Sequence, residues 1–108
     1  MLRRNFVFKI IPMLNPDGVI YGNYRCSLLG VDLNRRWLAP SRILHPTIYY
    51  TKRMIKVLSE VQEITLFVDL HGHSRKRDSF MYGCNVKNPD IEDIKRNVLV
   101  KMVPFLMA

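Results

Sequence analysis

Two histidines that could bind a metal follow an apolar run in the stretch FVDLHGHSRKRD, residues 67–78. In an extended segment His71 and His73 would point to the same side, because side chains alternate along a strand. Imidazole is a common zinc ligand, so the pair is a candidate metal site. A solvated, hydrogen-bonded strand end is the simpler interpretation of so short a motif, so support from other residues is needed.

A second group of candidate residues lies in and before GVDLNRRW, residues 30–37. Asn34 and Arg35 offer an amide and a planar fork of donors, which suit a two-pronged grip on a carboxylate. Arg25 supplies another positive donor, and Asp32 supplies a carboxylate. A charged surface loop is the default interpretation of each of these residues taken alone.

A strand, a helix and a second strand are expected to position these residues. Residues 6–14 and 64–70 are rich in aromatic and β-branched side chains, as buried strands are. Pro46 opens a helix between them, at a position where its missing N–H costs nothing. The apolar face of that helix consists of Ile48, Thr51, Ile55, Leu58 and Val61.

This order of elements predicts an α/β fold. A strand, a helix and a strand with a right-handed crossover form a parallel pair. The sequence therefore predicts part of a mixed, largely parallel sheet flanked by helices. Ligands of such sheets bind beyond the carboxyl ends of the strands, and His71 follows one of those ends.

The connecting segments carry weaker signals. The stretch NPDG, residues 15–18, predicts a turn, because Pro16 presets φ and Gly18 permits positive φ. Residues 19–38 are expected to form a long ordered loop, and residues 79–84 a short third strand. A second helix is predicted from Asn88, a cap residue, with Pro89 at its first position. Its apolar face consists of Ile91, Ile94, Val98, Met102 and Phe105.

Length and composition limit the class of protein. The 108 residues allow one domain, and 48% hydrophobic with 24% charged residues is typical of a globular chain. The net charge of +8 favours an acidic partner such as nucleic acid, an anionic membrane or an acidic peptide. Lys9 interrupts the apolar start, and no stretch approaches the roughly 18 apolar residues of a membrane span. We expect a soluble, intracellular protein whose two cysteines are free thiols.

Four ordered motifs together resemble the middle of a zinc metallocarboxypeptidase of the carboxypeptidase A type. They are NPDG, an isolated arginine, DLNRRW and, after a helix, an apolar strand that ends in DLHGHS. The forms DLNRRW and DLHGHS, with the MYGC that follows, are most similar to the cytosolic carboxypeptidase subfamily. Those enzymes remove glutamate from acidic tails and polyglutamate side chains of tubulin and other proteins. The resemblance therefore implies a cytoplasmic hydrolase that uses Zn²⁺ and acts on acidic, tubulin-like C-terminal tails.

The resemblance also implies a role for each candidate residue. His71 matches the last of the three protein zinc ligands of the family. Asn34 and Arg35 match the pair that binds the terminal carboxylate of the substrate. Arg25 matches the arginine that polarises the scissile carbonyl and stabilises the oxyanion. Asp32 matches an acid that orients another zinc-ligating histidine.

Other groups of the family have no match in the sequence. The His-x-x-Glu motif that supplies the first two zinc ligands is absent, and no acid can be matched to the general-base glutamate. His73 takes no family role, and with residues 75–77 it forms basic surface by default. Residues 1–108 are therefore expected to be a partial zinc carboxypeptidase catalytic domain that is inactive alone.

Two other classes of function compete with this interpretation. The chain could be a non-catalytic piece that grips acidic peptides through Arg25, Arg35 and the bases at residues 75–77. It could also be a small basic module that binds nucleic acid. The apolar strands do not alternate basic with aromatic residues, and no recognised DNA- or RNA-binding motif is present. Nucleic acid is therefore the weaker prediction.

Overall fold

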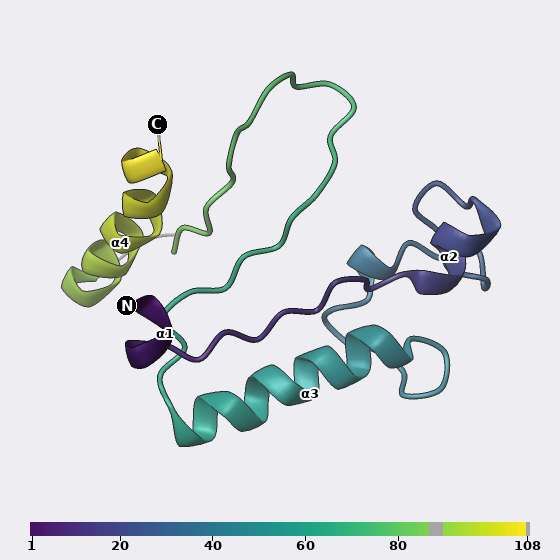
Figure 1. The fold of residues 1–108 in the computed structure, drawn as a ribbon, viewed down its shortest axis with the longest axis horizontal. Helices are drawn as coiled ribbons and strands as arrows, with labels where there is room; N and C mark the ends of the chain where they lie inside the picture. Colours follow the sequence, from purple (N-terminus) through teal and green to yellow (C-terminus); the bar gives the residue numbers. More distant parts are fainter. Residues whose placement is uncertain (87–89, 108) are drawn as a thin grey trace. The chain divides into compact units, whose positions relative to one another are not determined.

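The computed structural model describes residues 1–86 and 90–107 (Figure 1). The chain divides into two units, Met1–Phe67 and Val68–Ala108. In the residues that the structure describes, the first unit contains three α-helices and one turn of 3-10 helix, and the second contains one helix. The elements are α1 (Leu2–Asn5), α2 (Pro16–Tyr21), η1 (Leu33–Arg35), α3 (Pro46–Val61) and α4 (Ile91–Met107).

Helix α3 confirms the prediction of a helix that opens at Pro46. Proline occupies its first turn, and the chain leaves the helix at Gln62 with extended backbone angles. Of the predicted apolar face, Ile48 and Thr51 are buried, with 1% and 7% of their surface exposed. Burial fades toward the end of the helix, where Val61 is exposed. The first two turns of α3 therefore carry most of the packing.

Helix α2 corrects the prediction of a turn at residues 15–18. Asn15 is its N-cap and accepts a hydrogen bond from the backbone N–H of Gly18 at 3.1 Å, while Pro16 occupies the first turn. Gly18 is buried and is not among the residues with positive φ. The left-handed residue is Gly22, which ends the helix with φ 73°. The same Asn-Pro signal starts a turn or a helix, and here it starts a helix.

The segment predicted as a long loop, residues 19–38, is ordered by short local structure. Its start is the second half of α2, and its end is η1. Between them Cys26 and Asp32 form an isolated antiparallel bridge around a tight reversal. The N–H of Ser27 donates to the carbonyl of Val31 at 3.0 Å, and Gly30 takes a positive φ of 68° inside the reversal. This reversal brings the segment that carries Arg25 next to the segment that carries Asp32 and Asn34.

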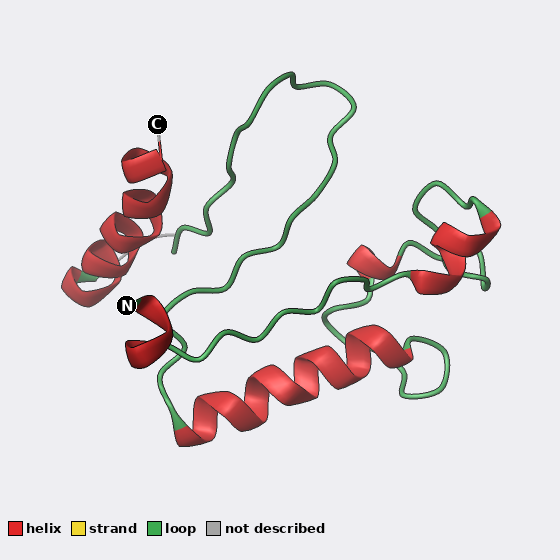
Figure 2. Ribbon diagram, in the orientation of Figure 1, coloured by secondary structure: helices red, strands yellow, loops and turns green. Residues whose placement is uncertain are grey.

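The three predicted strands are not paired in the described residues. Residues 6–14, 64–70 and 79–84 are drawn as loops in Figure 2, and the bridge at Cys26 is the β-type pairing that the described part of the chain contains. Their apolar side chains lie largely in solvent, with Ile10 82% and Leu70 90% exposed. A strand needs neighbours to bury its faces and to satisfy its backbone groups. The largely parallel α/β sheet therefore stays a prediction.

The second unit contains the predicted C-terminal helix. Helix α4 begins at Ile91, and the side chain of Asp90 caps it by accepting from the N–H of Asp93 at 2.8 Å. The predicted cap Asn88 and Pro89 lie outside the described residues. The side chain of Asn97 forms hydrogen bonds of 2.9 and 3.4 Å with the backbone of Val86, which anchors the preceding segment to the helix. Across the described residues, no helix has the length and apolar character that crossing a membrane requires.

Candidate functional site

Asp32 is the centre of the candidate site in the first unit. Its Oδ2 lies 3.5 Å from Nη1 of Arg25, across the reversal that joins the two segments. Its Oδ1 accepts a hydrogen bond from the backbone N–H of Asn34 at 2.9 Å and so caps η1. One carboxylate therefore fixes two predicted site segments, the one that carries Arg25 and the one that carries Asn34 and Arg35.

Arg25 keeps its positive charge in this environment. Its guanidinium carbon lies 5.2 Å from the centre of the Tyr24 ring. Contact with Tyr24 first, and then with Asp32, raises the pKa of Arg25 above its ordinary value. The side chain is 55% exposed, so the charge remains open to a ligand. A permanently protonated guanidinium is suited to stabilise a developing oxyanion.

Asn34 and Arg35 lie in η1, where both are exposed. The N–H of Arg35 donates to the carbonyl of Asp32 at 3.1 Å, which holds the turn. The indole Nε1 of Trp37 donates to Oδ1 of Asn34 at 3.0 Å. An amide and a guanidinium on one short turn are the donors that a carboxylate accepts in two-pronged fashion.

His71 lies in the second unit, beside an acid. Its Nδ1 is 2.9 Å from Oδ1 of Asp69, two residues earlier. A carboxylate that orients an imidazole is the usual companion of a metal-ligating histidine. His71 is one ligand, and among residues 1–86 and 90–107 no group of three His, Cys, Asp or Glu side chains is placed to hold a metal. The roles that the resemblance implies would require His71 and Arg35 to open onto a common cleft. They belong to different units, so this requirement stays a prediction.

His73 has a local structural role in the basic turn that follows. Its Nδ1 accepts hydrogen bonds from the backbone N–H groups of Arg75 and Lys76 at 3.1 and 3.0 Å. Its ring meets that of Phe80 edge-on at 5.0 Å, and the ammonium of Lys76 lies 4.8 Å from the centre of the Phe80 ring. Because Nδ1 of His73 already accepts these two backbone hydrogen bonds, the structure favours a solvated, hydrogen-bonded strand end over a metal site formed by His71 and His73.

Sequence reasoning missed three residues that position the site. Asp69 could have been found, since alternation places it on the same face as His71. Trp37 stands three residues after Asn34, the spacing at which side chains meet in a tight helical turn. Asn15 donates from Nδ2 to the carbonyl of Cys26 at 3.2 Å. Local sequence patterns do not predict a contact between residues so far apart in the chain.

Two substitutions of Asp32 should separate its cap from its charge. We expect Asp32→Ala to lower the free energy of unfolding by about 1 kcal/mol, because η1 loses its cap. Asp32→Asn should cost only a few tenths of a kcal/mol, because asparagine caps as well as aspartate and exposed ion pairs contribute little. Urea unfolding followed by circular dichroism measures both. Equal losses in the two variants would show that the cap is not what Asp32 contributes.

Comparison with known proteins identifies the family of the chain. The family model described as zinc carboxypeptidase matches residues 1–100. Cytosolic carboxypeptidase 1 of Xenopus laevis is 59% identical over 87 residues, which are 80% of this chain and 7% of that protein. Cytosolic carboxypeptidase 4 of Homo sapiens is 59% identical over 88 residues, 81% of this chain and 8% of that protein.

A third relative covers the whole chain. Cytosolic carboxypeptidase 2 of Danio rerio is 48% identical over 108 residues, 100% of this chain and 14% of that protein. The chain thus spans between 7% and 14% of the length of these relatives. Comparison with solved structures gives no match. Since the family model covers residues 1–100, the chain belongs to the zinc carboxypeptidase family, with cytosolic carboxypeptidases among its relatives.

Proposed function

We propose that this chain forms part of the substrate site of a metallocarboxypeptidase that removes C-terminal amino acids from acidic protein tails. Asn34 and Arg35 grip the terminal carboxylate of the substrate, and Arg25 stabilises the oxyanion. The observation that carries the proposal is the double contact of Asp32, which holds Arg25 on one side and caps the turn of Asn34 on the other. Family membership supports the same assignment.

Zinc is the metal of this family, and His71 is the residue of this chain that would hold it. The fit is partial: the imidazole next to Asp69 is a suitable donor, and a catalytic zinc takes two further protein ligands. When bound, zinc polarises a peptide carbonyl and activates water. The chain's own residues bind the carboxylate and neutralise negative charge near the bond that breaks.

The substrate that we propose is a tail rich in glutamate, such as that of tubulin, in the cytosol. The net charge of +8 favours an acidic partner. Arg75, Lys76 and Arg77 are exposed on the turn that follows His71 and add positive surface next to the proposed metal ligand. The printed names of the relatives, cytosolic carboxypeptidases, support the reaction and the compartment but leave the glutamate preference as part of the proposal.

The isolated chain should have no peptidase activity. One imidazole does not complete a three-ligand zinc site, so we expect no release of free glutamate when the 108-residue chain and zinc meet a glutamate-tailed peptide. The His71→Ala variant is the control, and both should give the same rate. The dissociation constant for zinc should exceed about 1 µM, which corresponds to a binding free energy of about −8.2 kcal/mol. Glutamate release above the His71→Ala rate would contradict the proposed incompleteness.

Recognition of a terminal carboxylate is the direct test of the proposal. The chain should bind a glutamate-tailed peptide with a free C-terminus about tenfold more tightly than the same peptide with a C-terminal amide, since a charge-assisted pair is lost. Arg35→Lys should remove most of this preference, because an ammonium lacks the planar fork. Arg53→Lys on α3 is the matched control. Equal affinity of the parent chain for both peptides would exclude the proposed carboxylate site.

A non-catalytic role in binding acidic peptides is the second candidate function. It is favoured by the basic turn at residues 75–77, which His73 and Phe80 hold in a defined conformation. In that case binding would depend on the total charge of the peptide and not on its C-terminus. A chelator would leave it unchanged, whereas added salt would weaken it.

A further inference from the structure

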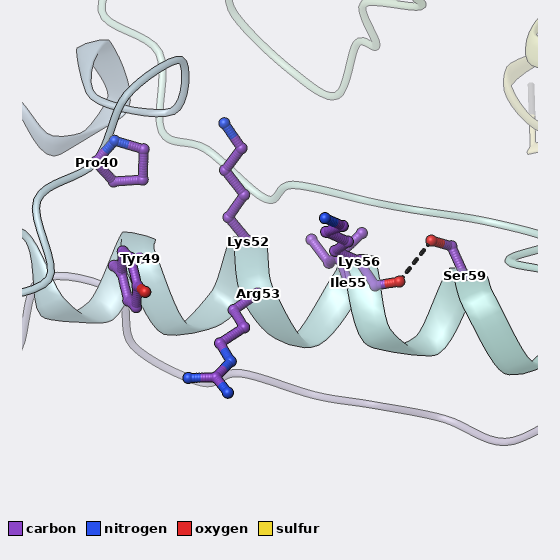
Figure 3. Close-up of a pocket in the computed structure, with 7 residues that line it drawn as sticks. All are labelled: Pro40, Tyr49, Lys52, Arg53, Ile55, Lys56 and Ser59. Carbon is purple, nitrogen blue, oxygen red and sulfur yellow. Dashed lines mark hydrogen bonds between the residues drawn. The ribbon is translucent and has the colours of Figure 1, made fainter.

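The orientation of the Arg25 guanidinium decides how well it can stabilise an oxyanion. Donors that already face the developing charge cost no reorganisation when it appears, whereas a long surface side chain explores many rotamers. Arg53 on α3 illustrates the ordinary surface arginine, since Figure 3 shows it extending away from the helix on the side opposite to Lys52. Arg25 is 55% exposed, so contacts at the surface must supply the orientation that burial does not.

The contact with Asp32 holds one edge of this guanidinium loosely. Nη1 of Arg25 lies 3.5 Å from Oδ2 of Asp32, which is longer than the roughly 2.7–3.2 Å of a well-formed N–H···O hydrogen bond. Exposed ion pairs of this kind contribute little to stability by themselves. A contact at one edge also leaves the plane of the guanidinium free to turn about that edge. A second contact is therefore needed to fix the plane.

Tyr24 supplies the second contact. Neighbouring side chains point to opposite sides of an extended chain, but here the chain bends at Tyr24 and Arg25. The bend brings the guanidinium carbon of Arg25 over the Tyr24 ring, 5.2 Å from its centre. A cation within roughly 6 Å of a ring centre is attracted to the face of the ring. Contact with Tyr24 is also the largest cause of the raised pKa of Arg25.

The two contacts leave part of Arg25 open to a ligand. A guanidinium carries several N–H donors in a fixed plane, and within the described part of the chain Arg25 donates to Asp32 alone. The Tyr24 ring is 83% exposed, so burial in a core does not explain its place. With one face against the ring and one edge against Asp32, the remaining donors of Arg25 point to a restricted set of directions.

We propose that Tyr24 is a positioning residue, which fixes the guanidinium plane of Arg25 so that its remaining donors face the bond that breaks. The inference rests on the proposed function, in which Arg25 stabilises the oxyanion. It adds that an exposed aromatic ring, through Arg25, sets part of the affinity of the site for a tetrahedral, negatively charged group.

The test measures recognition of such a group by the 108-residue chain. The probe is a glutamate-tailed peptide whose last peptide bond is replaced by a phosphinate, a tetrahedral group with a negative charge. The comparison peptide keeps the amide bond and carries an additional glutamate upstream, so that the total charges match. A chelator excludes metal ions from both measurements. We expect the parent chain to bind the phosphinate about tenfold more tightly, because a charge-assisted contact with Arg25 is gained.

Two substitutions of Tyr24 separate its ring from its hydroxyl. Tyr24→Leu removes the ring and should reduce the preference for the phosphinate about twofold to fivefold. Tyr24→Phe keeps the ring and should retain the preference. Tyr21→Leu, which changes another exposed tyrosine on α2, is the control. A merely structural role of Tyr24 would weaken the binding of both peptides together.

Two further measurements make the mechanism specific. In an Arg25→Met background there is no guanidinium to orient, so Tyr24→Leu should cause no further loss of preference. Nuclear magnetic resonance relaxation of the Arg25 Nε–H group should show larger picosecond-to-nanosecond motion in Tyr24→Leu than in the parent chain or in Tyr24→Phe. Circular dichroism checks that the variants fold, and Tyr24→Gln replaces Tyr24→Leu if the leucine variant does not.

The outcomes separate this inference from the proposed carboxylate site. The preference for a free over an amidated C-terminus tests Asn34 and Arg35, and Tyr24→Leu should leave it unchanged. If the parent chain does not prefer the phosphinate, Arg25 does not face the bond that breaks and the inference is overturned. It is also overturned if Tyr24→Leu prefers the phosphinate as strongly as the parent chain, or if the loss persists in the Arg25→Met background.

Discussion

Ile48→Ala should lower the free energy of unfolding of the chain by about 2–4 kcal/mol. Ile48 is the one large side chain with less than 2% of its surface exposed in the described residues, and it lies in the first turn of α3. Truncation removes its buried methyl and methylene groups and leaves a cavity, and both effects destabilise. The better helix propensity of alanine offsets only a few tenths of a kcal/mol.

The measurement is urea unfolding followed by far-ultraviolet circular dichroism. Val57→Ala is the matched control, because it removes a β-branched side chain from the same helix at a position that is 51% exposed. That variant should change the free energy of unfolding by less than about 0.5 kcal/mol. Similar losses in both variants would mean that α3 is not held by its buried face.

Ile48→Ala should also affect the candidate site, because α3 contacts the segment that follows η1. The helix carries Lys52, whose ammonium donates to the carbonyl of Trp37, and the indole of Trp37 in turn donates to Oδ1 of Asn34. Loosening of α3 should therefore also weaken the proposed preference for a free C-terminus, since Asn34 belongs to the proposed carboxylate site. The fold and the proposed recognition are coupled through these two hydrogen bonds.

The two long helices, α3 and α4, were predictable because their signals are local. Pro46 and a repeat of apolar residues at steps of three and four suffice to predict α3, and the apolar face of α4 repeats in the same way. Strands differ, because their stability comes from partners far away in the sequence. Residues 6–14 and 64–70 have the composition of strands, yet the described residues contain no neighbour that pairs with them.

The candidate site was predictable in its residues but not in its connections. The motif around Asp32 indicated which side chains could bind a carboxylate. Local spacing did not show that one Asp32 oxygen contacts Arg25 while the other caps the turn of Asn34. The helix at Pro16 was missed for a related reason, since the Asn15 side chain that caps it also reaches the carbonyl of Cys26. Side chains with two simultaneous partners are what sequence patterns describe least well.

Gly18→Ala is expected to destabilise the chain by about 1–3 kcal/mol, although alanine is the better helix former. Alanine would favour α2 by about 1 kcal/mol through propensity alone. However, its Cβ would lie 2.5 Å from the carbonyl oxygen of Cys26 and would overlap the side-chain amide of Asn15. Backbone that must move costs about 1–3 kcal/mol, and a displaced cap costs about 1 kcal/mol more. The clash therefore outweighs the gain in propensity.

The effect should extend to carboxylate recognition, because Cys26 follows Arg25 directly and pairs with Asp32. A shifted Cys26 carbonyl would disturb the 3.5 Å contact between Arg25 and Asp32. Urea unfolding measures the stability, and the affinity for the free glutamate-tailed peptide measures the site. Gly72→Ala is the control, since its Cβ would meet open space and its φ is not positive. A Gly18→Ala variant as stable as the parent would show that α2 does not pack against the segment that carries Arg25. The hydrogen bond from Asn15 to the Cys26 carbonyl would then not help to position the site.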